Sequence, residues 1–406
     1  MYDPNTSGDP YEGLRKGLKE FNPDVVGISV RNVDTLTFSD NFYYLKTLSP
    51  SLSIIKEIVP GAKIVIGGPG FSIFAPQIMG RYRELDFGVF LEGEETFPEL
   101  LSNFETPGNV KGVYYRDGTD IKFTGRRELP DFEEEKHPKR DLLPPSKYRD
   151  PYSLGVLAKR GCSLKCIYCN YSFLNGLRIR ERSPQDIVDE LQNLSVNYGV
   201  KTFMFADAIF NLPKKHAVEI CNEIIRRKLE MKWGAYFTEI GFDDEFAGLL
   251  KKSGCNLVFF SPDGNSEKSL KLLKKPIDAS EIKRTFKLAS RNKDINFIFC
   301  FFFNPPGQDL ISFIKLFLTS VWYNYIAKGN INVPLNNPRL EPHTDIYRMA
   351  IEEGVSLTED ELLPKREEEL AKLFYVNPSL KIANTIMLNF SRIIKGVKRV
   401  LRGARP

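Results

Sequence analysis

Short apolar runs alternate with amphipathic stretches along the first hundred residues. The apolar runs predict buried strands, at residues 24–30, 63–67 and 87–91. The stretches between them have apolar residues at helical spacing and predict helices, near residues 11–20, 48–58, 73–81 and 95–104. Apolar strands that alternate with helices are typical of a parallel sheet with helices on its faces. The pattern therefore predicts an α/β domain over residues 1–110.

Residues 111–150 differ from this pattern. The stretch VYYRDGTDIKFTG, residues 113–125, contains two β-rich runs around Asp117-Gly118, a pair that favours the positive φ angles of a hairpin turn. From Leu129 to Pro151 the chain is crowded with proline and charge, which is too polar and too broken for a core element. We therefore expect a hairpin and a linker between two domains.

A second series of strands and helices begins at Leu154. Apolar runs predict strands, at residues 154–159, 201–206, 232–237, 256–261 and 295–303. Amphipathic stretches predict helices, at residues 184–197, 214–229, 243–252, 266–273, 279–291 and 308–326. Successive strand–helix units on one sheet predict a partial (β/α)6 TIM-type barrel over residues 151–345, with its active site at the carboxyl ends of the strands.

The composition and the placement of the cysteines indicate the compartment of the cell. The chain has 406 residues, of which 42% are hydrophobic, enough for two or three domains. Its N-terminus lacks the pattern of a secretory signal, and no apolar run approaches the ~18 residues of a membrane span. The six cysteines are unevenly placed, with none in the first 161 residues, which excludes a disulfide framework. We expect a cytoplasmic protein in which Cys221, Cys255 and Cys300, each in an apolar setting, are buried structural residues.

Basic residues are concentrated at the C-terminus. The formal net charge is +5, but from Leu370 onward there are eight Lys or Arg and no Asp or Glu. The rest of the chain, with 49 basic and 52 acidic residues, has a net charge of −3. A basic surplus confined to one tail argues against a nucleic-acid partner and favours a local contact made by the tail.

The C-terminal region, residues 346–406, is predicted to be helical and to end in a basic amphipathic tail. Apolar residues recur at helical spacing from Ile382 to Leu401, opposite basic residues such as Arg392 and Lys398. Such a helix can lie on an anionic membrane, which would suit a lipid substrate and a peripheral location at the inner membrane surface. The alternative is a terminal helix that packs on the protein's own barrel, with its charges in solvent.

Three cysteines stand together directly after the first strand of the predicted barrel. Cys162, Cys166 and Cys169 lie in the stretch GCSLKCIYCNYS, separated by three and then two residues. A structural zinc ion needs four Cys or His ligands, and no histidine lies within twenty residues of this group. An iron–sulfur cluster held by three thiolates instead leaves one iron open for another molecule. The spacing favours a cluster over a zinc site that uses a distant ligand.

This CxxxCxxC motif after the first strand of a strand–helix barrel, with an aromatic residue before the last cysteine, resembles the radical S-adenosylmethionine enzymes. In that family three cysteines hold a 4Fe–4S cluster, and the amino and carboxylate groups of S-adenosylmethionine (SAM) bind the fourth iron. The resemblance implies that Cys162, Cys166 and Cys169 are the cluster ligands. It also implies an electron donor such as flavodoxin or ferredoxin, and cleavage of SAM to a 5′-deoxyadenosyl radical that abstracts hydrogen from a substrate.

The resemblance extends to residues that would contact SAM. Tyr168 matches the aromatic residue that packs near the adenine, and the alternative is a tyrosine that serves packing only. Asp207, in MFADAIFN at the end of the second barrel strand, is the acidic residue available to accept hydrogen bonds from the methionyl amino group. The family often has a glycine-glycine-glutamate stretch there instead. The alternative role of Asp207 is to cap a helix.

Two further loops at the carboxyl ends of strands match positions where the family contacts SAM. Ser261 and Asp263 follow the fourth strand, where the family binds the ribose and carboxylate groups; a turn or a helix N-cap is the alternative. Gly307 lies in the loop after the fifth strand, which in the family approaches the adenine. A glycine permits that approach, or it serves the turn alone.

The first domain resembles the cobalamin-binding domain, a flavodoxin-like Rossmann fold, that precedes the barrel in one large subgroup of the family. Ser29 and Arg31 follow the first apolar run as in the serine-x-leucine element of that domain, with Arg31 in place of leucine. Gly67 and Gly68 end the second run, where glycines let the backbone approach the nucleotide tail of cobalamin. The tract LEGEE after the next strand also resembles this subgroup. The resemblance implies cobalamin as a further cofactor.

The chain departs from this domain at its beginning. Residues MYDPN resemble the end of the domain's second strand, so we expect the first strand and helix to be missing. In a flavodoxin-like strand order of 2-1-3-4-5 the missing strand would be interior, and the run at residues 24–30 would lose a neighbour. No histidine precedes His137, so the aspartate-x-histidine element that can ligate cobalt is absent as well. A truncated chain or a partner that covers the edge would explain the departure.

These resemblances imply a class B-type radical SAM enzyme that transfers a methyl group through cobalamin to an unactivated carbon of a small-molecule or lipid substrate. The absence of cysteine from the first domain argues against the methylthiotransferases, which need a second cluster there. One alternative is a radical SAM cyclase or rearrangement enzyme without functional cobalamin binding. Another is a non-catalytic protein that binds a cluster or a partner.

Overall fold

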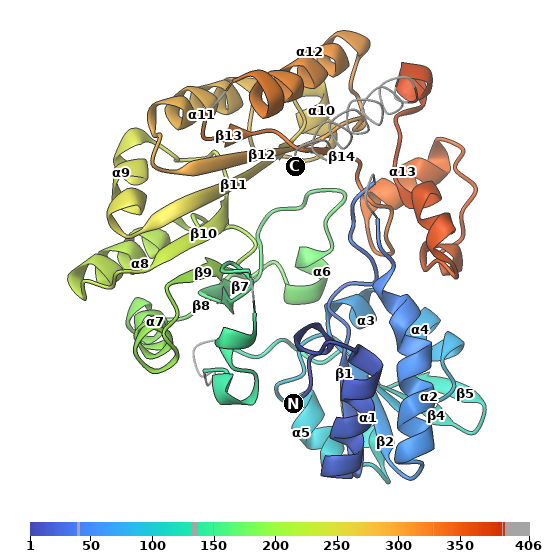
Figure 1. Cartoon of the computed structure of the whole chain (residues 1–406). Coiled ribbons are helices and arrows are strands. Elements are labelled where there is room, and N and C mark those ends of the chain that lie inside the picture. The colour runs from blue at the N-terminus through green and yellow to red at the C-terminus, as the bar shows by residue number, and fades with distance from the viewer. Residues whose placement is uncertain (39–40, 132–136, 149, 328, 384, 386–406) are drawn as a thin grey trace, which may run out of the picture.

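Two α/β units, the first with a mixed sheet and the second with a parallel one, make up the part of the chain that the computed structural model describes. That part is residues 1–38, 41–131, 137–148, 150–327, 329–383 and 385 (Figure 1). The first unit is a Rossmann-like sheet and the second a partial barrel, so the predicted fold class is confirmed. Among the described residues, no helix is long and apolar enough to cross a membrane.

The first sheet contains five strands in the order β1-β2-β3-β4-β5. The strands are β1 (Val25–Ser29), β2 (Lys63–Gly67), β3 (Phe87–Val89), β4 (Val113–Asp117) and β5 (Asp120–Phe123). The helices of this unit are α1 (Pro10–Phe21), α2 (Leu48–Ile58), α3 (Pro69–Ile73), α4 (Ala75–Arg81) and α5 (Thr96–Leu101). β1, β2 and β3 are parallel, whereas β4 pairs antiparallel with β3 and β5. The hairpin predicted to accompany the linker therefore extends the first sheet, and β1 is its other edge.

The second sheet is a barrel that remains open between β6 and β13. Its strands are β6 (Gly155–Val156), β9 (Thr202–Phe205), β10 (Lys232–Phe237), β11 (Cys255–Asp263), β12 (Asn296–Phe302) and β13 (Ile331–Asn332), in sequence order, with β14 (Leu335–Asn336) also beside β12. All of these pairs are parallel. A small antiparallel hairpin, β7 (Lys159–Arg160) with β8 (Arg180–Glu181), stands apart. Because β6 ends at Val156, the run predicted as one strand is divided between the barrel and this hairpin.

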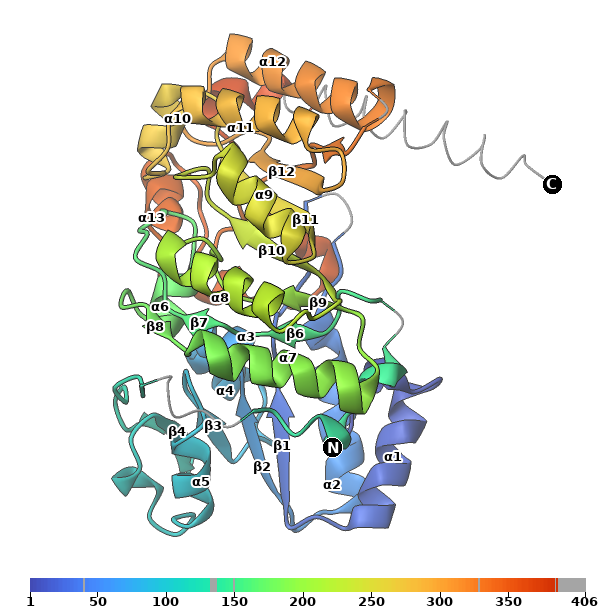
Figure 2. The ribbon, with the colours of Figure 1, turned by 90° about the vertical axis from the view of Figure 1, so that its left-hand side faces the viewer.

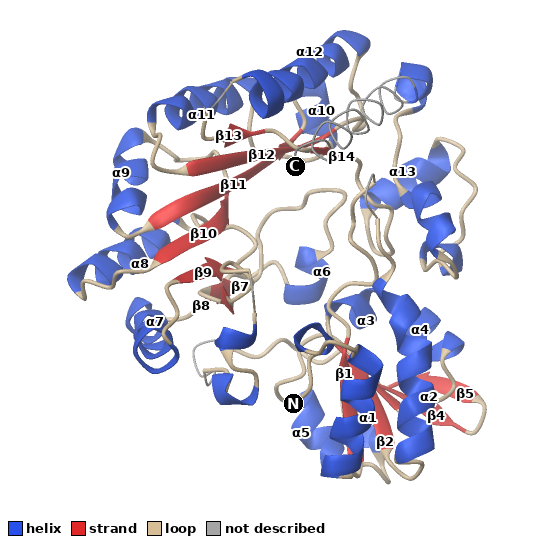
Figure 3. Ribbon diagram, in the orientation of Figure 1, coloured by secondary structure: helices blue, strands red, loops and turns tan. Residues whose placement is uncertain are grey.

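Helices cover the outer side of the barrel sheet, as Figures 2 and 3 show. They are α7 (Pro184–Tyr198), α8 (Lys214–Arg226), α9 (Asp244–Lys252), α10 (Glu267–Leu272), α11 (Ala279–Arg291) and α12 (Leu310–Val321), which a π-helical turn, η6 (Trp322–Ile326), continues. Alternate strand residues such as Phe205, Trp233 and Phe299 are buried against these helices. The other set faces the concave side, and it includes Cys300, which is half-buried. The prediction that all three isolated cysteines are buried is thus correct for Cys221 and Cys255 only.

The C-terminal region packs against the first unit. It contains α13 (Asp345–Glu352), and α6 (Tyr171–Asn175) lies between the units (Figure 1). Apolar residues of this region, such as Leu363 and Tyr375, share one core with residues of the first sheet. Asp34 forms a buried ion pair with Arg339 (3.0 Å), which fixes the region in place. The predicted amphipathic tail lies almost entirely outside the described residues, which end with 385.

Candidate active site at the cysteine loop

The three cysteines lie in a loop that runs from β7 to α6, at the carboxyl end of the first barrel strand. Backbone hydrogen bonds hold the loop on several sides. The Cys162 amide donates to the Gly176 carbonyl (3.1 Å), and the Ile167 amide donates to the Leu273 carbonyl that follows α10 (3.2 Å). The Ile167 carbonyl accepts from the Ile346 amide of α13 (2.9 Å). Segments far apart in the sequence therefore fix the position of the loop.

Gly161 allows the chain to enter this loop. Its φ angle is +89°, and a β-carbon there would lie 2.0 Å from the carbonyl oxygen of Arg178. Arg178 lies two residues before β8, which is paired with β7, so the two backbones are held close together. Only glycine fits at position 161 while this hairpin is formed.

The three thiols lie near one another in surroundings that are partly closed. Cys162 and Cys166 are half-buried and Cys169 is exposed. Burial, together with the charges of the neighbouring Cys166 and Cys162, nevertheless raises the pKa of the Cys169 thiol to about 12. Cys169 is therefore reached by solvent but surrounded by protein, with the other two sulfur atoms close by.

This donor set fits an iron–sulfur cluster better than a single metal ion. In the described part of the chain, no group of three His, Cys, Asp or Glu side chains converges closely enough to hold one ion. Thiolates of a cluster bind different irons and need not converge on one point. The Tyr171 amide also donates to Cys169 Sγ (3.4 Å), an interaction that stabilises a thiolate ligand. The three cysteines would hold three irons of a 4Fe–4S cluster and leave the fourth iron for SAM.

A buried hydrogen-bonded group lies beside the loop and consists of Tyr168, Asp263 and Lys275. The Tyr168 hydroxyl donates to the Asp263 carboxylate, while Lys275 Nζ donates to Asp263 Oδ2 (2.9 Å) and to the Ser261 carbonyl (2.6 Å). Burial raises the pKa of Asp263, and the Lys275 ammonium opposes that shift. Burial alone would lower the pKa of Lys275, but the charges of Asp263 and Cys166 raise it instead. Two predicted SAM-site residues thus meet around a buried lysine that the sequence analysis did not single out.

Glu239 is a second buried acid at this end of the barrel, two residues after β10 (Lys232–Phe237). Its Oε1 atom has no hydrogen-bond partner among the described residues. Burial raises the pKa of Glu239 to about 7; the Lys275 charge lowers it and the Asp263 charge raises it. The carboxyl group is therefore close to half-protonated at neutral pH.

Replacing Glu239 with glutamine is expected to remove a pH dependence of stability. The folded state keeps the Glu239 proton up to a pKa of about 7, whereas the unfolded chain releases it near 4.5, so folding binds a proton between these values. The wild type should lose about 3 kcal/mol relative to Glu239→Gln as the pH rises from 4.5 to 7. Denaturant unfolding of both proteins across this range measures the difference. Parallel pH profiles for the two proteins would contradict the shift.

Asp207 is buried at the carboxyl end of β9. Its Oδ1 atom accepts hydrogen bonds from the amides of Ala158 (2.8 Å) and Lys159 (3.2 Å). Its Oδ2 atom lies 3.8 Å from Lys159 Nζ and has no hydrogen-bond partner among the described residues. The next helix, α8, has Pro213 at its N-cap, so Asp207 does not cap a helix. Asp207 ties β9 to the chain that enters the cysteine loop, and its contact with SAM stays a prediction.

The other two predicted SAM contacts have different surroundings. Ser261 is half-buried on the concave side of β11, next to Cys300. Gly307 has a φ angle of +75°, and a β-carbon there would lie 2.6 Å from the side chain of Leu272 in α10. The close approach that Gly307 permits is to this helix, which explains the glycine without SAM.

The residues predicted to bind cobalamin gather at the carboxyl ends of β1 and β2. Gly68 has a φ angle of +93°, and a β-carbon there would lie 2.7 Å from the carbonyl oxygen of Val30. Gly68, next to Gly67, thus lets the loops after β1 and β2 pack together. Ser29 and Arg31 are exposed, and neither side chain has a hydrogen bond or ion pair with another described residue. These two polar groups fit a ligand at the carboxyl edge of the sheet, where cobalamin would lie.

Ion pairs join the two units beside the cysteine loop. Glu92, in the LEGEE tract after β3, accepts a hydrogen bond from Arg180 of β8 (2.9 Å) and lies 3.0 Å from Arg160 of β7. Each of these three side chains is at most 12% exposed. Breaking such a buried pair would leave an uncompensated charge. The tract therefore holds the carboxyl edge of the first sheet against the segment that carries the cysteines.

Aromatic side chains line the concave side of the barrel. Tyr168 packs edge-on against Phe302, with ring centroids 4.7 Å apart, and Phe259 stacks with Tyr236 at 4.9 Å. Tyr236 is 42% exposed. Burial raises the pKa of Tyr236, and the positive charge of Arg31 opposes the shift, so the guanidinium group lies nearby. Two aromatic pairs thus lie on the concave side of the barrel, one at the cysteine loop and one between β10 and β11.

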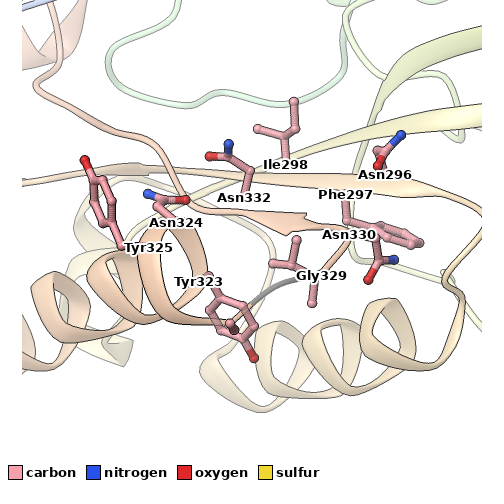
Figure 4. Close-up of a pocket in the computed structure, with 11 residues that line it drawn as sticks. Asn296, Phe297, Ile298, Tyr323, Asn324, Tyr325, Gly329, Asn330 and Asn332 are labelled. Carbon is pink, nitrogen blue, oxygen red and sulfur yellow. The ribbon is translucent and has the colours of Figure 1, made fainter. Parts of the chain in front are cut away.

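A separate pocket of about 410 Å³ lies at the other end of the barrel sheet (Figure 4). It is lined by the first residues of β12, by β13 and by η6, and Asn296, Asn330 and Asn332 border it. Three donor contacts of Asn330 Nδ2 go to backbone carbonyls of the α11 region, which gives this residue a structural role. In barrels of this kind the active site lies at the carboxyl ends of the strands. We therefore do not assign the reaction to this pocket.

Comparison with known proteins identifies two domain families in this chain. The family model of the radical SAM superfamily matches residues 156–316, and the model of the B12 binding domain matches residues 2–101. An uncharacterized methyltransferase of Pyrococcus horikoshii is 30% identical over 288 residues, which cover 69% of this chain and 60% of the relative. An anaerobic magnesium-protoporphyrin IX monomethyl ester cyclase of Cereibacter sphaeroides is 26% identical over 300 residues, covering 70% and 47%. The chain thus spans about half to three fifths of the length of these relatives.

Solved structures share the fold of most of the chain. The radical SAM methyltransferase TsrM from Kitasatospora setae, with tryptophan substrate and a SAM analog bound, superimposes with a TM-score of 0.74 at 20% identity. The match covers 92% of this chain and 78% of TsrM. The cobalamin-dependent radical enzyme OxsB superimposes with a TM-score of 0.62 at 19% identity, covering 91% of this chain and 50% of OxsB. At these identities the likeness establishes the fold.

Proposed function

Because the chain carries a B12 binding domain followed by a domain of the radical SAM superfamily, we propose that it is a cobalamin-dependent radical SAM methyltransferase. The observation that carries the proposal is the junction at Glu92, which holds the carboxyl edge of the first sheet beside the cysteine loop. A methyl donor on the first unit and a radical source on the second would then face the same space.

When they are bound, the cluster would supply an electron for SAM cleavage and the cobalamin would supply a transferable methyl group. The chain supplies position and surroundings. Cys162, Cys166 and Cys169 would hold the cluster, and the loop that carries them is fixed by backbone hydrogen bonds on several sides. Ser29 and Arg31 are exposed polar groups at the carboxyl edge of the first sheet, where cobalamin would lie.

The substrate would occupy the concave side of the barrel. Tyr236, Phe259 and Phe302 offer apolar and stacking contacts there, and burial among them would keep water from a carbon radical. We propose a class B-type transfer to an unactivated carbon of a small-molecule or lipid substrate. A flavodoxin or ferredoxin would serve as the electron donor.

The second candidate is a radical SAM cyclase or rearrangement enzyme. The observation that favours it is the 26% identical cyclase of Cereibacter sphaeroides, which aligns over 70% of this chain. A third possibility, a cluster-binding protein without catalysis, makes different predictions from both enzymes.

One assay separates these three functions. The full chain is reconstituted anaerobically with iron, sulfide and hydroxocobalamin, and is then given SAM and dithionite. A methyltransferase is expected to form both 5′-deoxyadenosine and S-adenosylhomocysteine, because it uses SAM as radical source and as methyl donor. A cyclase should form only the first product, and a non-catalytic protein neither. The Cys162→Ala variant, which lacks one expected ligand, controls for background cleavage, and bound cobalamin is measured by its absorption.

A further inference from the structure

Lys275 is held beside the cysteine loop by the way in which α10 ends. Lys274 has a φ angle of +55°, and the Lys275 amide donates to the Leu270 carbonyl (2.9 Å), so the chain turns back at this point. The Leu273 carbonyl, just before the turn, accepts a hydrogen bond from the Ile167 amide of the cysteine loop (3.2 Å). The backbone that carries Lys275 is therefore fixed both to its own helix and to the loop.

The Lys275 ammonium has three hydrogen-bond acceptors inside the protein. They are the Asp263 carboxylate (2.9 Å), the Ser261 carbonyl (2.6 Å) and the Tyr168 hydroxyl (3.4 Å), and Tyr168 belongs to the loop, between its second and third cysteines. An ammonium group has three N–H donors, so these acceptors use all of them. The Lys275 side chain is only 10% exposed. Lys275 can therefore act on neighbouring groups through its charge, without donating a hydrogen bond to a ligand.

The three thiols of the cysteine loop lie within the range of this charge. Burial raises the pKa of Cys162, Cys166 and Cys169, and the positive charge of Lys275 lowers the pKa of each. At Cys166 the effect of Lys275 exceeds the opposite effect of the Asp263 carboxylate. The pair of Lys275 and Asp263 therefore acts on this thiol as a net positive charge.

A positive charge at this position affects the reduction of the cluster that the three cysteines would hold. Three thiolates make such a site anionic, and reduction adds one more negative charge. A nearby cation stabilises the reduced form more than the oxidised form, because their attraction grows with the negative charge on the cluster. Burial strengthens this effect, since water and salt screen a buried charge less than an exposed one.

We propose that the buried Lys275 ammonium is an internal counter-ion of the 4Fe–4S cluster and raises its reduction potential. The proposal rests on the cluster of the function proposed above, and it gives Lys275 a role in electron transfer without contact with substrate or SAM. A higher potential would let a weaker electron donor reduce the cluster. Asp263, which is 6% exposed, holds the ammonium in place and reduces its effect on the potential.

The test is a redox titration of the full chain without SAM, after anaerobic reconstitution with iron and sulfide, with the reduced cluster measured by EPR. The pH is held constant, because Glu239 has a pKa of about 7 and its charge acts on Lys275. Lys275→Met should make reduction about tenfold less favourable, which corresponds to a potential about 59 mV more negative. Asp263→Asn should shift the potential in the positive direction, because it removes the negative member of the pair.

The adjacent Lys274 provides the matched control. It pairs with Asp345, but both side chains are about half exposed, so Lys274→Met should change the reduction equilibrium by less than about twofold. Because Lys275→Met loses stability, the double variant Lys275→Met, Asp263→Asn is titrated as well. Its potential should lie between those of the two single variants and below that of the wild type, since the cation has the larger effect. Iron content and absorption show which variants hold the cluster, and the double variant decides if Lys275→Met does not.

Two results would overturn the proposal. One is a potential in Lys275→Met, or in the double variant, that equals that of Lys274→Met. The other is a shift of Lys275→Met and Asp263→Asn in the same direction, which would show that loosening of the loop controls the potential. A wild type that assembles no cluster would overturn the proposed function as well, whereas unchanged potentials of an assembled cluster would overturn this inference alone.

Discussion

Replacing Gly161 with alanine is expected to prevent stable assembly of the cluster. The added β-carbon would lie 2.0 Å from the Arg178 carbonyl oxygen, in a residue whose φ angle is +89°. Because the hairpin of β7 and β8 holds Arg178 in place, the cysteine loop itself must move. We expect a loss of more than about 3 kcal/mol in stability around the loop. Iron content and cluster absorption after anaerobic reconstitution should fall toward those of a cysteine-to-alanine variant, and 5′-deoxyadenosine formation should be lost.

The matched control is Gly199→Ala. Gly199 also has a positive φ angle, +65°, but no atom lies within 4 Å of a β-carbon built there. Its substitution should cost only the intrinsic strain of about 1–2 kcal/mol and leave the iron content unchanged. Equal iron content in Gly161→Ala and Gly199→Ala would show that the loop does not depend on this close approach.

Replacing Lys275 with methionine is expected to destabilise the protein by about 3–5 kcal/mol, because it leaves the buried Asp263 carboxylate without its cation. Lys275 and Asp263 are 10% and 6% exposed and lie 2.9 Å apart. Denaturant unfolding measures the loss. A second substitution, Asp263→Asn, in the same chain removes the unpaired charge and should restore part of the stability.

The adjacent Lys274 provides the control. It forms an ion pair with Asp345 at 2.7 Å, but both side chains are about half exposed. Lys274→Met should therefore cost less than about 1 kcal/mol. If Lys274→Met and Lys275→Met had the same cost, or if Asp263→Asn added to the loss, the pairing in the buried group would be refuted.

The elements of the fold were predictable because the central strands of both sheets are largely buried. Runs such as residues 63–67 and 232–237 stand out from the amphipathic helices between them, and both form strands as predicted. The single run at 154–159 was divided, since Asp207 and the pairing of β7 with β8 hold its second half away from the barrel. Cys300 was misjudged because alternation along a strand places its side chain on the concave side, which composition does not show.

The site was predictable only where its residues form a local motif. Cys162, Cys166 and Cys169 lie within eight residues, so their spacing alone indicated a cluster with an open iron. Tyr168 and Asp263 were selected from the resemblance, but no sequence signal joined them to Lys275. Nothing in the sequence distinguishes Lys275 from the other lysines, because its burial results from the packing of the barrel.

The sequence by itself determined the succession of strands and helices and the cysteine motif, since both depend on residues close together in the chain. The tertiary structure decided which distant residues meet. It brought Glu92 to Arg160 and Arg180 across the boundary between the two sheets. It also left the outer side of α12 exposed, although the sequence of that helix is as apolar as a buried one. Such long-range contacts depend on how two surfaces pack, and a local pattern of side chains does not predict that packing.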